Sequence, residues 1–157
     1  MLVAVVSDTH NVTEYIEKVK RLIKKSDVLI HLGDNITDLD YLISDYKGKV
    51  YGVKGNCDFS NEYPSEMLVK VLDKKFFITH GHKYNVKYEL NSIYFKAMEV
   101  EADAALFGHT HQSLITQERN LWIINPGSAS LPRMSKRSIA FIEVVEGKPI
   151  YPYLVEV

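Results

Sequence analysis

The stretch MLVAVVSDTHNVTEYIEKVKRLIKKSDVLIHLGDN (residues 1–35) places two short apolar runs on either side of a segment with helical periodicity. The runs 2–6 and 27–32 are rich in valine, leucine and isoleucine, which is typical of strands covered on both faces. Between them, in residues 11–25, apolar side chains recur every three or four positions. This spacing predicts an amphipathic helix, with Asn11 and Glu14 as a capping pair.

The alternation of strand and helix continues beyond this stretch. Apolar runs bounded by turn residues predict further buried strands at 49–53 and 102–107. A second helix is expected to begin at Thr37 and continue to residue 46, and a third to cover roughly residues 86–99. Strands that alternate with helices favour sheets covered by helices on their outer faces.

Hairpin signals appear later in the chain. Residues 66–80 are expected to form a hairpin with its turn at 73–74. The tail, 113–157, is expected to form short antiparallel strands with turns at NPGS (125–128) and EGK (146–148). The whole pattern predicts an α/β fold, a layered sandwich with sheets inside and helices outside, in a single domain over residues 1–157.

Composition narrows the class of protein. The chain has 157 residues, of which 46% are hydrophobic and 25% are charged, so it can bury one sizeable core. Its net charge of -1 lacks the basic footprint of a protein that binds a nucleic-acid polymer or an anionic membrane. One cysteine fits a reducing compartment, and the short apolar opening resembles neither a signal peptide nor a membrane span, so we expect a cytoplasmic protein. The tyrosine-rich segments 88–95 and 151–153 fit either an interface between copies, as in a homo-oligomer, or the edge of the core.

Polar clusters follow the expected strands, at SDTH (7–10), LGDN (32–35), GNCD (55–58), THGH (79–82) and GHTH (108–111). Taken singly, each has a simpler explanation: Asp8 or Asp34 as a helix cap, Asn56 and Asp58 as turn formers, His80 as a hydrogen-bonded core or surface residue. Taken together, they follow successive strand ends, and ligands bind in the crevice beyond the carboxyl ends of such strands. We therefore expect the clusters to converge on one site.

The side chains in these clusters are those that bind divalent metal ions. Imidazole nitrogens with carboxylate or amide oxygens, without thiolate, favour manganese, iron, nickel, cobalt or zinc over calcium, and manganese is our first expectation. The candidates are too many for one ion but suit two ions if one carboxylate bridges them. The seven candidate ligands are Asp8, His10, Asp34, Asn56, His80, His109 and His111.

The ordered motifs DxH, GDN, GNCD, GH and GHTH, followed by NPGS and LPR, resemble those of the calcineurin-like metallophosphoesterases, most closely their small bacterial and archaeal phosphodiesterase branch. The resemblance extends from Ser7 to Arg133. It implies a four-layer α/β/β/α sandwich and a dinuclear centre in which a metal-bridging hydroxide hydrolyses a small phosphoester, with a phosphodiester as the first expectation. It also implies two ligand sets that share Asp34: Asp8, His10, Asp34 and His111 for one ion, and Asp34, Asn56, His80 and His109 for the other.

Further residues in the motifs are candidates for catalysis. Arg133 is either a phosphate ligand or simply solvated, and His82 either orients His80 or lines the pocket. Cys57 stands where many relatives in the wider superfamily carry a histidine that resembles a general acid. Since a thiol is a weaker donor, we expect a preference for good leaving groups. Asp58 is expected to orient Cys57 or its neighbours, and Asn56 is grouped with these residues as well as with the metal ligands.

Two details of the GHTH cluster complete the prediction. Gly108 is expected to let the backbone turn beneath the metals, and Thr110 to point away and only pack. The alternative function is a non-catalytic scaffold that binds proteins, because the same fold resembles a retromer-type subunit whose metal pocket has lost ligands. An enzyme and a scaffold differ in whether the metal-ligand set is complete. In this chain every expected ligand position carries a side chain that can bind a metal ion.

Overall fold

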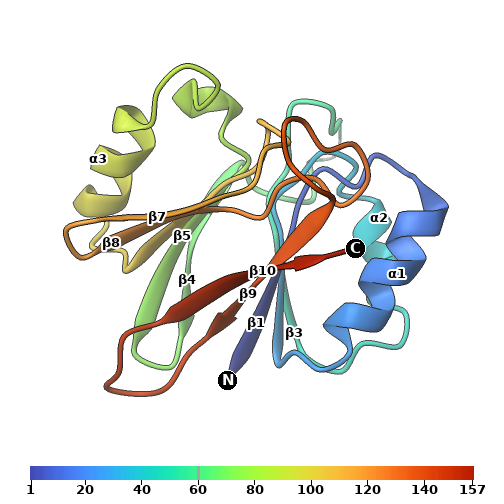
Figure 1. Ribbon diagram of the computed structural model, residues 1–157, viewed down its shortest axis with the longest axis horizontal. Coiled ribbons are helices and arrows are strands. Elements are labelled where there is room, and N and C mark those ends of the chain that lie inside the picture. Colours follow the sequence, from blue (N-terminus) through green and yellow to red (C-terminus); the bar gives the residue numbers. More distant parts are fainter. Residues whose placement is uncertain (60) are drawn as a thin grey trace.

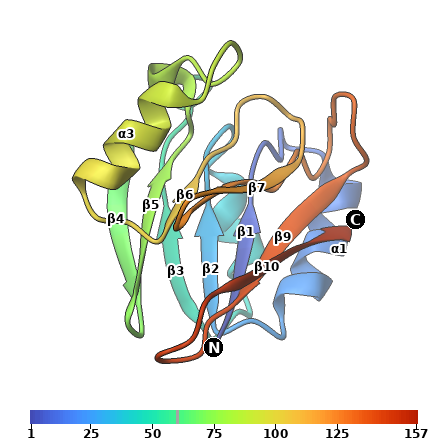
Figure 2. The same ribbon diagram turned by 60° about the vertical axis from the view of Figure 1, so that its left-hand side comes forward.

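The computed structural model describes residues 1–59 and 61–157. It contains two five-stranded sheets packed face to face, with helices on both outer sides (Figure 1 and Figure 2). The predicted α/β sandwich is confirmed. In chain order the elements are β1 (Leu2–Val6), α1 (Thr13–Ile23), β2 (Val28–His31), α2 (Asp38–Leu42), β3 (Lys49–Gly52), β4 (Glu66–Val71), β5 (Lys74–Thr79), η1 (His82–Tyr84), α3 (Asn91–Glu99), β6 (Ala104–Leu106), β7 (Leu114–Glu118), β8 (Leu121–Asn125), β9 (Ser138–Glu143) and β10 (Tyr151–Glu156).

The first sheet has the order β10-β9-β1-β2-β3. Strands β1, β2 and β3 run parallel, with Val5 opposite Ile30 and Ile30 opposite Tyr51. Because side chains alternate along a strand, Ala4 and Val6 face outward while Val3 and Val5 face the second sheet. The outward side chains pack with one face of α1 and with α2, in a cluster that includes Ile16 and Val19.

The second sheet has the order β4-β5-β6-β8-β7. The predicted hairpin over 66–80 is confirmed as β4 and β5, and β7 with β8 forms another antiparallel pair. The tail forms the antiparallel pairs β7–β8 and β9–β10 as predicted, and β8 also pairs in parallel with β6, which precedes the tail. NPGS (125–128) begins the connection from β8 to β9 in the other sheet, whereas EGK (146–148) lies between the antiparallel strands β9 and β10.

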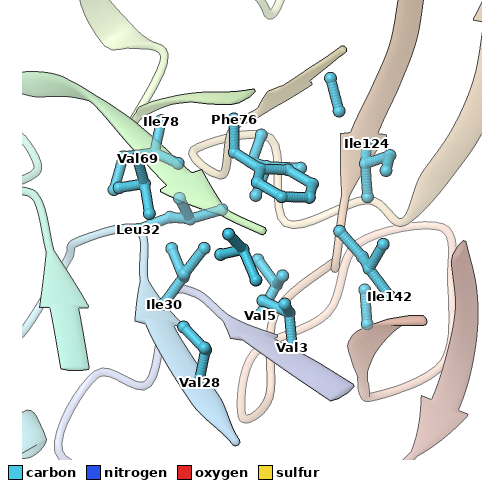
Figure 3. Packing of buried hydrophobic residues seen from close by; sticks show 14 of the residues in the cluster. Val3, Val5, Val28, Ile30, Leu32, Val69, Phe76, Ile78, Ile124 and Ile142 are labelled. Carbon is cyan, nitrogen blue, oxygen red and sulfur yellow. The ribbon is translucent and has the colours of Figure 1, made fainter. Parts of the chain in front are cut away.

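The main core lies between the two sheets (Figure 3). Val5 and Ile30 of the first sheet lie opposite Phe76 and Ile78 of the second, and all four side chains are fully buried. A side chain of this size contributes about 1.5–3 kcal/mol when it is buried. This shared core holds the two sheets together and so fixes how their ends meet.

The helices differ in detail from the predicted ones. The residue before α1 is Val12, which offers no polar cap, and Asn11 instead has a left-handed backbone (φ 56°) and donates its N–H to Asp38 Oδ2 at 2.9 Å. Helix α3 begins at Asn91 rather than near residue 86, and α2 ends at Leu42. Among residues 1–59 and 61–157, no helix has the length and apolar character needed to cross a membrane.

Candidate metal centre

Loops from both sheets meet at one rim of the molecule. The loops after β1, β2 and β3 and those after β5, β6 and β8 all follow strands that run parallel within their own sheets. Contacts between the sheets join these loops. His80 Nδ1 lies 2.8 Å from the Leu32 carbonyl, and the His109 N–H donates to Asp8 Oδ2 at 3.1 Å. The expected convergence of the polar clusters is therefore present in the structure.

The structure forms two groups of side chains that can hold a metal ion. Asp8, His10, Asp34 and His111 form one, and Asp34, His80 and His109 form the other. Within each group the ligand atoms all lie within 4.8 Å of one another, and Asp34 belongs to both. Six of the seven predicted ligands are thus brought together, and their role as ligands stays a prediction.

Asp8 is held from several sides. Its Oδ2 accepts the Ser7 hydroxyl at 2.6 Å and the His109 N–H at 3.1 Å. Its backbone carbonyl accepts the hydroxyls of Ser128 at 2.7 Å and Ser130 at 3.1 Å. The other carboxylate oxygen, Oδ1, lies 3.2 Å from His111 Nε2. The side chain is therefore fixed with one oxygen aimed at the site.

Two histidine rings are each oriented by a backbone carbonyl. The Nδ1 atoms of His80 and His111 contact the carbonyls of Leu32 (2.8 Å) and Leu131 (2.6 Å). A carbonyl only accepts, so each Nδ1 carries the hydrogen, and in the neutral ring Nε2 keeps its lone pair. His80 Nε2 lies 3.3 Å from Asp34 Oδ1. Acceptor atoms that face each other in this way fit a shared divalent cation, and a backbone acceptor behind the ring is the usual support of a metal-binding histidine.

Unsatisfied polar atoms support the same interpretation. Among the described residues, the buried atoms Asp8 Oδ1, His80 Nε2 and His82 Nδ1 have no hydrogen-bond partner. Burying such atoms costs free energy unless something compensates, and a cation compensates for acceptors. The donor set of imidazole nitrogen and carboxylate oxygen fits a transition-metal ion.

Backbone strain is concentrated in the same loops. Asp8, His10, Asp34, His109 and His111 all have φ between 48° and 67°, in the left-handed region. This conformation is uncommon for residues other than glycine, and it persists where the surrounding structure holds it, often at functional sites. The strain turns five of the predicted ligands toward a common point.

The charges of the site favour a cation. Burial is the largest influence on the pKa of Asp8 and raises it, but the nearby His111 ring, the His80 charge and the Ser7 hydroxyl outweigh burial, and the pKa lies below its ordinary value. For Asp34, burial again raises the pKa, and His80 and Cys57 outweigh it, so the pKa lies well below its usual range. Both carboxylates are therefore ionised at neutral pH.

The histidines divide into two kinds. Burial lowers the pKa of His80, but Asp34 and Asp8 outweigh burial and raise it, and the adjacent Asp8 carboxylate raises the pKa of His111. Burial, followed by the charges of His80 and Lys87, lowers the pKa of His109 to about 4. His109 is accordingly neutral at pH 7, the form in which imidazole binds metals.

Asp58 contacts the neighbours of Cys57 rather than its thiol. Its carboxylate accepts the backbone N–H groups of Asp34 (2.9 Å), Ile36 (2.8 Å) and Gly55 (2.8 Å), rather than orienting the Cys57 side chain. It thus fastens the loop after β2 to the loop after β3. Cys57 is placed by its own N–H, which donates to Asp34 Oδ1 at 3.0 Å.

Replacing Asp58 with alanine should weaken this connection between the loops. Three partly buried N–H donors lose their acceptor, and we expect the free energy of unfolding to fall by about 2–4 kcal/mol. Manganese affinity should fall about 10–100-fold, because Asp34 loses its support. Urea unfolding and calorimetric titration measure the two effects, with Asp40→Ala on the exposed side of α2 as the control. Unchanged affinity in Asp58→Ala would contradict this role.

The remaining predicted residues lie at the rim. Asn56 is exposed, and its amide donates to Cys57 Sγ at 3.3 Å. His82 faces the cluster, with its ring centroid 5.5 Å from that of His80 and 6.1 Å from that of His109. The alternative in which His82 orients His80 is not observed, because the Leu32 carbonyl does so. Arg133 is exposed, and its N–H donates to the His111 carbonyl at 2.9 Å.

Gly108 and Thr110 also differ from the expectation. A Cβ on Gly108 would lie 1.9 Å from Ser7 Oγ and 2.8 Å from Asp8 Oδ2, so this glycine is required by close approach rather than by a turn. The Thr110 hydroxyl accepts the Asn125 amide at 2.9 Å and so takes part in the loop network.

Two sets of supporting residues were missed by sequence reasoning. The loop after β8 supplies Asn125, Ser128 and Ser130, all buried, and Asn125 also donates to the Gly108 carbonyl at 2.9 Å. The sequence does contain a signal for these residues, because the polar segment NPGSAS directly follows a buried strand, as the other clusters do. The second is His31, which lies fully buried in β2, accepts the Gly33 N–H at 3.2 Å and lies 3.3 Å from Thr9 Oγ1. The only sequence signal for the supporting role of His31 was its position inside an apolar run.

His31 should make stability depend on pH. Burial lowers its pKa from 6.5 to about 4. As the pH falls through this interval the unfolded chain binds the proton first, so the free energy of unfolding should decrease, by up to about 3 kcal/mol. Urea unfolding in chelator from pH 7 to pH 4.5 should show a shallower decrease for His31→Gln than for the natural chain. Equal slopes would contradict the assignment.

A two-sheet sandwich with aspartate and histidine side chains gathered at its rim is the arrangement of a metallophosphoesterase. Residues 1–147 match the profile of the calcineurin-like phosphoesterase superfamily domain, and the chain belongs to that superfamily. It is 35% identical over 138 residues to the probable metallophosphoesterase YsnB of Bacillus subtilis, covering 87% of this chain and 79% of that one.

Solved structures share the fold. A novel archaeal phosphodiesterase superposes with a TM-score of 0.79 at 22% identity, covering 99% of this chain and all (100%) of that one. Vps29 from Chaetomium thermophilum superposes with a TM-score of 0.78 at 18% identity, covering 99% and 96%. At these identities the likeness is one of fold alone. The superfamily nevertheless identifies a metal-binding phosphoesterase framework.

Proposed function

We propose that this protein is a dinuclear metal-dependent phosphodiesterase that hydrolyses small phosphodiesters, with residues 1–157 acting as one domain in the cytoplasm. The observation that carries the proposal is that Asp34 belongs to both ligand groups. A carboxylate with two oxygens is the side chain that can bridge two cations. The chain shares its fold with an archaeal phosphodiesterase, and we extend that substrate class to it as part of the proposal.

The ligands divide between two ions as follows. Asp8, His10, Asp34 and His111 would hold one, and Asp34, His80 and His109, completed by Asn56 from the adjacent loop, would hold the other. Manganese is the first candidate. Bound ions of this kind neutralise charge on the phosphoryl group and lower the pKa of a water nucleophile.

The protein itself positions the substrate. His82 is partly exposed and has its ring next to His80 and His109, so it is placed to hydrogen-bond a phosphate oxygen at the rim. Arg133 is held against His111 through the backbone and can offer its guanidinium to a phosphate of the substrate other than the one at the metal centre. Both side chains would act on substrate orientation.

Turnover of bis(4-nitrophenyl) phosphate with and without manganese tests the proposal. We expect release of nitrophenol after chelator treatment to require added manganese, and calorimetry to show two ions bound per chain. Two bound ions with no metal-dependent turnover of any diester would favour the protein-binding scaffold. A single bound ion would contradict the dinuclear centre.

Cys57 should make the rate sensitive to the leaving group. Its thiol is a weak donor, and burial followed by the nearby Asp34 charge raises its pKa. We expect aryl diesters to be cleaved faster than alkyl diesters, and Cys57→His to raise the alkyl rate relative to the aryl rate by about tenfold or more, in the range of general acid catalysis. Cys57→Ser is the matched control for size. An unchanged alkyl-to-aryl ratio in Cys57→His would rule out this role.

A further inference from the structure

A pocket of about 480 Å³ lies beside the candidate metal centre. It is lined by the segment between η1 and α3, which includes Lys87 and Tyr88, and by Arg133 and Met134 from the loop after β8. Phe107, at the end of β6, also lines it. Pockets that bind small organic ligands have volumes of about 300–1,000 Å³, so this one can hold a nucleotide-sized group.

The pocket is continuous with the metal-ligand loop. Its lining includes Thr110, which lies between His109 and His111, and Gln112, which follows His111. Arg133 is fastened to this loop by its N–H bond to the His111 carbonyl. A group attached to a phosphorus at the metal centre can therefore reach into the pocket.

The walls combine apolar area with positive charge. Tyr88 is 89% exposed and Met134 is 94% exposed, and they are two of the three most exposed large apolar side chains in the described part of the chain. Lys87 and Arg133 add two cations. Glu89 also lines the pocket, but its carboxylate accepts the Asn91 N–H and the Ser92 hydroxyl at 2.8 Å each, at the start of α3.

These features together favour one class of ligand. A planar aromatic ring is suited to contact with the ring of Tyr88 and the thioether of Met134, and an anionic group is suited to the two cations. A purely apolar ligand would form no ion pair with Lys87 or Arg133. Inorganic phosphate would make no contact with the apolar side chains of Tyr88 and Met134.

We propose that this pocket binds the organic part of a phosphodiester that carries both an aromatic base and a second phosphate, as in a short dinucleotide with a terminal phosphate. The inference rests on the proposed function and deepens it by naming the substrate class. Lys87 and Arg133 contact the second phosphate, and Tyr88 contacts the base. These residues determine specificity, whereas the metal ligands act at the scissile phosphorus.

The dinucleotides pApA and ApA form a matched pair for the test, because they differ only by the terminal phosphate. We expect the manganese-loaded natural protein to cleave pApA with a kcat/KM about tenfold higher than that for ApA. Lys87→Gln combined with Arg133→Gln should remove this preference mainly through KM for pApA. Tyr88→Ala should raise KM for both. Lys148→Gln, at the exposed turn between β9 and β10, is the control.

Equilibrium dialysis of pApA against the metal-free protein gives a readout that does not depend on turnover. Binding about tenfold weaker in the double variant than in the natural protein supports the pocket, even if no diester is hydrolysed and the proposed function fails. Equal binding of pApA by the two proteins overturns the pocket. A ratio of kcat/KM for pApA to kcat/KM for ApA near one in the natural protein also overturns the pocket. If metal-dependent cleavage of bis(4-nitrophenyl) phosphate persists in that case, the phosphodiesterase function stands.

Discussion

Replacing Asp34 with asparagine should lower manganese-dependent turnover of bis(4-nitrophenyl) phosphate by at least about a thousand-fold, equivalent to about 4 kcal/mol. Asp34 Oδ1 lies 3.3 Å from His80 Nε2 and Oδ2 lies 4.0 Å from His10 Nε2, so its two oxygens face different ligand groups. A neutral amide presents one oxygen acceptor and one nitrogen donor. It therefore cannot supply an anionic oxygen to both groups.

Metal binding distinguishes this explanation from simple loss of folding. Calorimetric titration should show two ions bound to the natural chain and at most one, more weakly, to Asp34→Asn. Asp40→Asn, on the exposed side of α2, is the matched control and should keep both ions and full activity. Urea unfolding in chelator checks that the variant is folded. Two bound ions with turnover near that of the natural chain would exclude Asp34 as the bridge.

Replacing Gly55 with alanine should disturb the same carboxylate without changing any ligand. A Cβ at this position would lie 2.1 Å from Asp34 Oδ1 and 2.7 Å from the Asp34 backbone nitrogen. Both distances are shorter than any stable contact, so Asp34 or the Gly55 loop must move. We expect a loss of at least about 2 kcal/mol in stability from overpacking, and about a hundredfold loss of turnover from a displaced ligand.

Gly147 provides the control for this substitution. It has a φ of 72°, and within the described structure a Cβ there meets nothing within 4 Å, so Gly147→Ala carries only the cost of the left-handed backbone, about 1 kcal/mol. We therefore expect Gly147→Ala to lose less stability than Gly55→Ala and to keep full turnover. Chelator-free thermal unfolding and the nitrophenol assay measure both quantities. Equal stability and equal turnover in the two variants would show that the Gly55 loop shifts to accommodate the methyl group without moving Asp34.

Much of the fold was predictable because its signals are local. The apolar runs in β1 and β2 and the periodicity in α1 depend on neighbouring residues, and these elements lie where the pattern predicts them. The predicted cap of α1 was wrong because its partner is not local. Asn11 has a competing partner in Asp38, 27 residues away, and a local pattern does not contain that partner.

The sequence by itself determined the alternation of strand and helix and the placement of aspartate, asparagine and histidine directly after the strands. Both follow from spacing along the chain. Only the tertiary structure decided that β8 pairs with β6, that Asp58 accepts three N–H groups from two loops, and that Lys87 and Arg133 line one pocket. The physical reason is that such contacts join residues far apart in the chain, and burial of the apolar faces shared by the two sheets fixes their geometry.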